Sequence, residues 1–124
     1  MFSHMMVGSN DLDKSKAFYD ATFKAMGGRA GAKDPKGRLV YMHNGGIFLV
    51  TLPIDGTPAT HGNGSTVGFA MTAEQADAWH AAGVANGGTA IEDAPGERPG
   101  SGYYLAYLRD PDGNKLCALH RVAG

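Results

Sequence analysis

Residues 103–120 read YYLAYLRDPDGNKLCALH and predict a complete β-hairpin. Two apolar, aromatic-rich runs flank the turn sequence Asp-Pro-Asp-Gly-Asn at 110–114, where proline presets one turn dihedral and glycine supplies a positive one. Because successive side chains of a strand point to opposite faces, Cys117 shares a face with Leu119 and lies opposite His120. The hairpin therefore predicts a sheet with one face buried and one face free to line a cavity.

The rest of the chain shows the same order of elements twice. The first half predicts a strand at 2–7, a helix that follows the capping side chains at 9–11, and strands at 38–43 and 47–52. The second half predicts a strand at 65–71, a helix that a capping box opens at 72–75, and a loop at 92–102 before the hairpin. Both helices stop at paired glycines sixty positions apart, Gly27-Gly28 and Gly87-Gly88, which indicates an internal repeat.

These two halves predict an α+β fold. Module one covers about 1–54, a linker rich in Pro, Gly and Thr covers about 55–64, and module two covers about 65–124. We expect curved mixed sheets around a cup-shaped cavity, with the helices outside.

Composition narrows the function classes. A chain of 124 residues with 43% apolar residues predicts a single domain with a hydrophobic core. The net charge of -1, with both signs interspersed, gives no reason to expect nucleic acid or a membrane surface as a partner. No secretory signal pattern, no membrane-spanning apolar run and only one cysteine are visible, so we expect a cytoplasmic location.

Three local signatures carry a resemblance to a known family. They are His4 in the first predicted strand, the segment from Asp11 to Phe18-Tyr19 in the first helix, and the turn at 110–114. With the doubled order of elements, they make the chain similar to the vicinal oxygen chelate superfamily, the glyoxalase, bleomycin-resistance and extradiol-dioxygenase group. The resemblance implies tandem βαβββ modules, usually in homodimers, whose cup-shaped sheets hold a metal and an oxygen-rich substrate.

The resemblance also implies where metal ligands would stand. The four family positions fall on His4, Leu49 or a strand neighbour, Thr66 and Cys117, where the last usually carries glutamate. Leucine has no donor atom and a threonine hydroxyl is a weak ligand, whereas a stable zinc site needs three or four donors. We therefore expect a degraded metal site and no cofactor; a divalent metal remains the alternative, with His4 as its first ligand.

Six residues are predicted to line the cavity: His4, Leu49, Thr66, Arg98, Tyr104 and Cys117. Arg98 and Tyr104 belong to the loop and strand that border the cavity in the family, and they could contact an anionic or aromatic molecule. His4 is the best catalytic candidate, although a hydrogen-bonded cavity histidine is the favoured interpretation over metal ligation or acid–base work. Cys117 is interpreted as a small buried apolar residue in preference to a nucleophile. His61, in the linker, could reach over the cup.

Three functions follow from these residues. The favoured one is a homodimeric binding protein, similar to the bleomycin-resistance branch, that holds a small molecule without a metal. The second is a metal-dependent lyase or dioxygenase resembling lactoylglutathione lyase. The third is a metal-free enzyme with His4 as base and Cys117 or Tyr104 as its partner.

Overall fold

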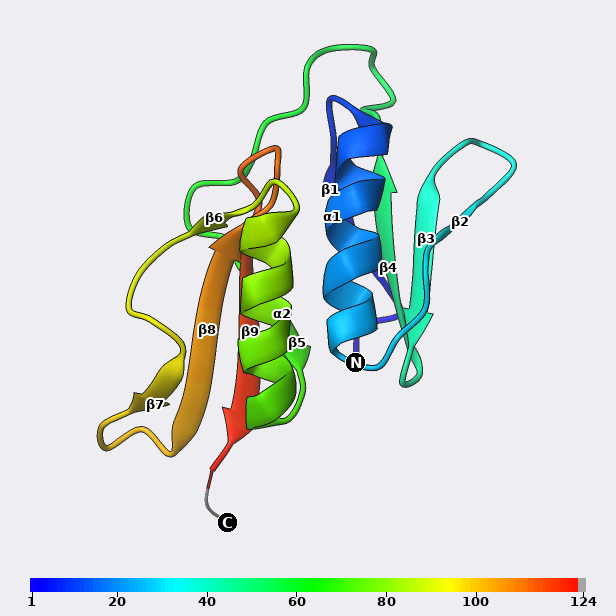
Figure 1. Ribbon diagram of the computed structural model, residues 1–124. Coiled ribbons are helices and arrows are strands. Elements are labelled where there is room, and N and C mark those ends of the chain that lie inside the picture. Colours follow the sequence, from blue (N-terminus) through cyan, green and yellow to red (C-terminus); the bar gives the residue numbers. More distant parts are fainter. Residues whose placement is uncertain (123–124) are drawn as a thin grey trace.

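The structure is a computed structural model of the chain and describes residues 1–122 (Figure 1). The first module comprises β1 (Met5–Gly8), α1 (Leu12–Ala25), β2 (Ala32–Lys33), β3 (Leu39–His43) and β4 (Gly46–Thr51). The second comprises β5 (Val67–Ala70), α2 (Ala73–Ala85), β6 (Thr89–Ala90), β7 (Gly96–Arg98), β8 (Tyr103–Arg109) and β9 (Lys115–Arg121). The predicted α+β fold with a doubled order of elements is confirmed.

Each module forms its own mixed sheet with the same topology. The first sheet has the order β1-β4-β3-β2, and the second has the order β5-β9-β8-β6, with β7 as an extra strand that pairs with β8. The first strand of each module runs parallel to the last, as β1 does to β4 and β5 to β9, while the other pairs are antiparallel. The loop predicted at 92–102 therefore contributes a short strand of its own.

Local signals in the sequence explain where the helices begin and end. Asp11 caps α1 by accepting hydrogen bonds from the amides of Asp13 and Lys14, and Thr72 forms with Gln75 the predicted capping box of α2. Gly27 and Gly87 both adopt a positive φ just beyond the helix ends, a conformation that glycine reaches without strain.

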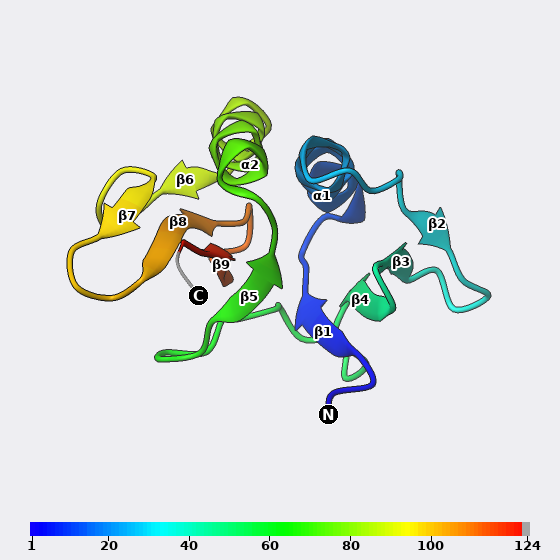
Figure 2. The same cartoon turned by 90° about the horizontal axis from the view of Figure 1, so that it is seen from below.

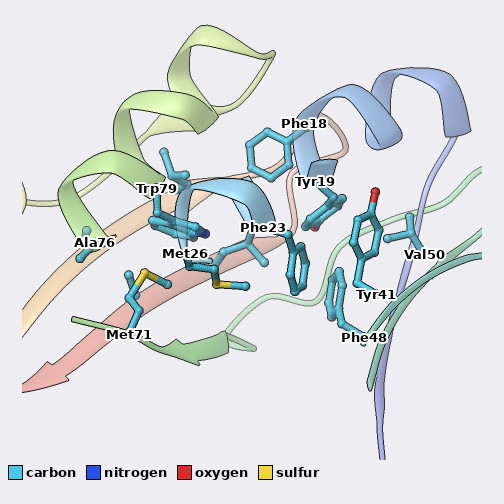
Figure 3. Close-up of a cluster of buried hydrophobic side chains, with 14 of the residues drawn as sticks. Phe18, Tyr19, Phe23, Met26, Tyr41, Phe48, Val50, Met71, Ala76 and Trp79 are labelled. Atoms are coloured by element: carbon cyan, nitrogen blue, oxygen red, sulfur yellow. The ribbon is translucent and has the colours of Figure 1, made fainter. Parts of the chain in front are cut away.

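The two helices lie side by side in the angle between the two sheets (Figure 2). Each sheet has an inner face, which packs on the helices, and an outer face, which is turned away from them. The buried aromatic and aliphatic core lies between the helices and the inner faces (Figure 3). The two outer faces point in different directions (Figure 2), so one chain does not enclose a cup between them.

A buried polar network joins the modules at one end. Asp110, which precedes the hairpin turn, accepts hydrogen bonds from the Tyr19 hydroxyl at 2.5 Å and from Nδ2 of Asn114 at 2.8 Å. Nδ2 of Asn114 also donates to the carbonyl of Gly8 at the end of β1, at 3.0 Å. The turn motif of the second module is therefore fixed to the first strand and first helix of the first module.

Within the described part of the chain, no helix is long and apolar enough to cross a membrane.

Candidate ligand-binding site

Cys117 lies on the outer face of the second sheet, and it shares this face with Leu119 and lies opposite His120, as the alternation of strand residues predicted. It stands opposite Tyr107 of β8 in the register and is only 6% exposed. Burial raises the pKa of the Cys117 thiol, and the neighbouring Tyr107 hydroxyl opposes this effect only in part. The thiol is therefore protonated near neutral pH, which agrees with a cavity-lining residue better than with a nucleophile.

Charged and phenolic groups surround Cys117 on this face. Lys115 forms an ion pair with Glu92, and its Nζ lies 5.0 Å from the centroid of the Tyr107 ring. Glu92 adopts a φ of 58°, a backbone conformation that residues other than glycine rarely take. Strained backbone of this kind gathers at binding sites, where the surroundings hold it in place.

Arg98 borders the same face from β7, but its guanidinium is already engaged. Nη1 donates to the carbonyls of Ala94 and Gly96, both at 3.0 Å, and Nη2 donates to the carbonyl of Asp93 at 3.2 Å. Arg98 therefore shapes its own loop, and contact with a ligand would use the donors that these bonds leave free.

The first sheet carries the other half of the predicted set. Leu49 lies on the outer face of β4, beside Met6 and Val40 in the register, and is 8% exposed. His4 was predicted within the first strand, whereas β1 begins one residue later at Met5. His4 is exposed, and its Nδ1 lies 2.8 Å from Oγ of Ser3. It stands at the border of the outer face.

Thr66 occupies the equivalent position before β5, where it is exposed. His61 lies against the hairpin turn, so close that a Cβ on Gly113 would stand 2.5 Å from its Nδ1. His61 is thus placed at the turn and not over the sheet. The residues brought together on the second outer face are Cys117, Tyr107, Lys115 and Glu92, with Thr66 and Arg98 at its border.

Tyr104 does not belong to this group, which corrects the predicted cavity lining. It stands opposite His120 in the register, three residues before Tyr107, so its side chain points to the inner face. There its hydroxyl donates a 2.6 Å hydrogen bond to Asp77 of α2, which is the main cause of a raised pKa at Tyr104. Counting alternate positions on both hairpin strands would have selected Tyr107, because it pairs with Cys117.

The side chains at the family's metal positions do not fit a metal ion. Leu49 has no donor atom, Thr66 offers only a hydroxyl, and Cys117 would bind a metal only after losing a proton whose pKa is raised by burial. Residues 1–122 also contain no group of three or more His, Cys, Asp or Glu side chains that could hold a metal. His4 and a deprotonated Cys117 would supply at most two good ligands, fewer than a stable site needs.

Comparison with known proteins agrees with this architecture. The family model of the glyoxalase/bleomycin resistance protein/dioxygenase superfamily matches residues 1–118. A glyoxalase/bleomycin resistance protein from Albidiferax ferrireducens T118 is 59% identical, with 98% of each chain covered and a TM-score of 0.91. No curated protein matches the chain.

More distant structures share the fold. The hypothetical protein SA1046 from S. aureus is 20% identical over 96% of this chain and 92% of its own, with a TM-score of 0.72. The fosfomycin resistance protein FosX from Listeria monocytogenes, in complex with Mn(II) and sulfate ion, is 17% identical over 95% of this chain and 87% of its own, with a TM-score of 0.69. From the family match and the 59% identical relative, the chain belongs to the glyoxalase/bleomycin resistance protein/dioxygenase superfamily.

Proposed function

We propose that this protein binds a small organic molecule on the outer faces of its sheets without the help of a metal ion. The observation that carries the proposal is the set of side chains at the family's metal positions. Leu49, Thr66 and Cys117 give an apolar, hydroxyl and thiol surface in place of charged ligands. Such a surface suits an organic molecule, because ligand pockets combine mostly apolar walls with a few well-placed polar groups.

The proposal includes a homodimer. The outer faces of one chain point apart, so a closed cup needs the first sheet of one copy to face the second sheet of another. These faces expose large apolar side chains that a partner would cover: Met6 at 40%, Met42 at 70%, Ile47 at 37% and Leu119 at 36%. His4 and Leu49 would then meet Cys117 and Tyr107 of the second copy.

The charged and phenolic groups define what the ligand would look like. The Tyr107 hydroxyl and the Lys115 ammonium are donors on the proposed cup wall, and the Glu92 carboxylate is an acceptor. Leu49 supplies an apolar wall on the opposite sheet. We infer a ligand with an apolar body and at least one oxygen that accepts a hydrogen bond.

The two enzyme alternatives have less support. A metal-dependent lyase or dioxygenase would need three or four metal donors, whereas Leu49 supplies none and the Thr66 hydroxyl is a weak one. A metal-free enzyme would use His4 as a base, yet His4 is exposed and contacts Ser3, with no acidic partner among the described residues to orient it. A cytoplasmic location remains a prediction, with which the single cysteine agrees.

Two experiments test the proposal. Elemental mass spectrometry of untagged protein, offered zinc, nickel, manganese and iron(II), is expected to find no stoichiometric metal. A thermal-shift screen with small aromatic and aliphatic carboxylates and phenols is expected to yield a stabilising ligand. Near-stoichiometric metal would contradict the proposal and favour the metal-dependent enzyme.

Matched variants then locate the ligand. Tyr107→Phe and His4→Ala are expected to weaken binding of the screened ligand about tenfold, because each removes a polar group from the proposed cup. Tyr104→Phe removes the corresponding hydroxyl on the inner face and is expected to leave the affinity unchanged. Equal losses for Tyr104→Phe and Tyr107→Phe would show that the ligand does not bind on the outer face.

A further inference from the structure

A cavity separate from the proposed cup opens between the two modules on the helix side. It has a volume of about 270 Å³, close to the lower limit of pockets that hold small organic ligands. Its walls come from both modules, with Met5, Phe23, Met26 and Phe48 on one side and Val67 and Phe69 on the other. We call it the inter-module cavity.

The position of this cavity follows from how the modules are joined. Asp110 fixes the hairpin turn to Tyr19 and to the carbonyl of Gly8, which lies at the carboxyl end of β1. The cavity lies at the other end, where Met5 begins β1 and Met26 follows α1. Because β1 and β5 are both terminal strands of their sheets, no described strand pair closes the modules at that end.

Three phenylalanine rings from three elements meet at the cavity. The Phe69 ring centroid lies 5.6 Å from that of Phe23 and 5.4 Å from that of Phe48, both edge to face. The rings of Phe23 and Phe48 are 6.0 Å apart and tilted, and Figure 3 shows them beside one another, while Met26 also lines the cavity. Ring edges and thioethers of this kind make favourable contacts with a further aromatic ring.

Apart from Tyr41, whose hydroxyl donates to Asp20, the polar side chains that line the cavity lie at one place. His43 and Asn44, at the tip of the β3–β4 hairpin, line it, with Nδ2 of Asn44 3.2 Å from Nε2 of His43. No Asp, Glu, Lys or Arg side chain is among the described residues that line it. A charged ligand would lose its hydration there without a carboxylate, ammonium or guanidinium group to pair with, whereas an uncharged ring has no such cost.

We propose that the inter-module cavity binds a small uncharged aromatic molecule, of about the size of one substituted ring, against the wall formed by Phe23, Phe48 and Phe69. This site does not depend on the proposed cup, since none of the six residues predicted for the cup lines it. Met5 and Met6 illustrate the separation. They are neighbours in β1 with nearly equal exposure, 39% and 40%, but Met5 lines the cavity and Met6 does not.

The methionine methyl groups allow a direct test with fluorobenzene as the probe. The chain has six methionines, and ¹³C-methyl labelling gives each a separate NMR signal. Titration of the full-length protein is expected to shift the signals of Met5 and Met26 in a saturable way, with a dissociation constant of about 1 mM or tighter. The signals of Met6 and Met42, on the outer face, are expected to stay fixed.

Two filling variants and one matched control complete the test. Met5→Phe and Val67→Phe place extra carbon in the cavity from opposite walls, and each is expected to weaken fluorobenzene binding about fivefold or more. Met6→Phe makes the same change on the outer face and is expected to alter the affinity less than about twofold. Two results in the unmodified protein would overturn the proposal: no saturable shift at Met5 and Met26, or shifts at Met6 and Met42 in their place. Both can be observed even if a filling variant fails to fold.

Discussion

The hydroxyl of Tyr19 donates a 2.5 Å hydrogen bond to Oδ2 of Asp110, which lies 91 positions later in the chain. Tyr19 is fully buried in α1, and Asp110 is buried at the start of the hairpin turn. Burial, reinforced by the charge of Asp110, raises the pKa of Tyr19 well above its ordinary value, so the hydroxyl remains a donor. The contact joins the first helix of one module to the last hairpin of the other.

Tyr19→Phe is expected to lower the free energy of unfolding by about 1–3 kcal/mol, because a buried carboxylate loses one of its donors. Tyr41→Phe is the control: its hydroxyl bonds to Asp20, which is partly exposed and keeps Lys16 and the Gly31 amide as donors. The control is expected to lose about 1 kcal/mol or less. Urea unfolding measures both, and equal losses would contradict a special role for the Tyr19–Asp110 contact.

Cys117 is expected to react slowly with a thiol reagent in the folded protein. Its thiol is buried and its pKa is raised by that burial, so little thiolate is accessible near neutral pH. Because it is the only cysteine, the reaction with Ellman's reagent reports on it alone. The folded protein at pH 7.5 is expected to react at least about tenfold more slowly than the same protein unfolded in urea. Equal rates would favour the enzyme alternative in which this thiol acts as a nucleophile.

Asp20 is expected to make stability depend on pH in the acidic range. Burial alone would raise the pKa of its carboxyl, but hydrogen bonds from Lys16, the Gly31 amide and Tyr41 outweigh burial and lower the pKa. A lowered pKa in the folded state gives stability that is present above the ordinary value of 3.8 and is lost as the pH falls below it.

The Asp20→Asn variant tests this linkage. The difference in unfolding free energy between the natural protein and the variant is expected to be constant from about pH 5 to 7 and to shrink below about pH 4. Urea unfolding at a series of pH values measures it. A difference that grew as the pH fell would show that the carboxyl pKa is raised in the folded state.

The proposed dimer predicts a mass of twice one chain by light scattering at micromolar concentration. Leu119→Arg places a charge on the outer face of β9, where a partner would cover it, and is expected to give monomers. Val84→Arg makes the same change at an exposed position of α2 and is expected to leave the dimer intact. A monomeric mass for the natural protein would remove the dimer from the proposal.

Much of the fold could be read from local signals in the chain. The capping residues Asp11 and Thr72, the paired glycines and the turn at 110–114 act over a few residues, so the sequence states them directly. The placement of Cys117 on the face opposite His120 follows from the two-residue period of a strand. Strand ends were predicted less well: β1 begins at Met5, which leaves His4 at its border.

The candidate site was predicted only in part, because it combines distant segments. Tyr104 was grouped with Cys117 although strand register turns it to the other face, where Asp77 binds its hydroxyl. Tyr107 and Glu92 were missed, since pairing and loop geometry bring them to Cys117.

By itself, the sequence determined the order of elements, the two modules and the lack of a strong metal ligand at Leu49 and Thr66, because these depend on residue type and short spacing. Only the tertiary structure decided that the helices pack together and that the outer faces point apart. It also decided that Phe23, Phe48 and Phe69 pack together and line a cavity between the modules. The physical reason is that contacts between segments far apart in the chain, such as Tyr19 with Asp110, depend on the packing of whole elements and leave no local pattern in the sequence.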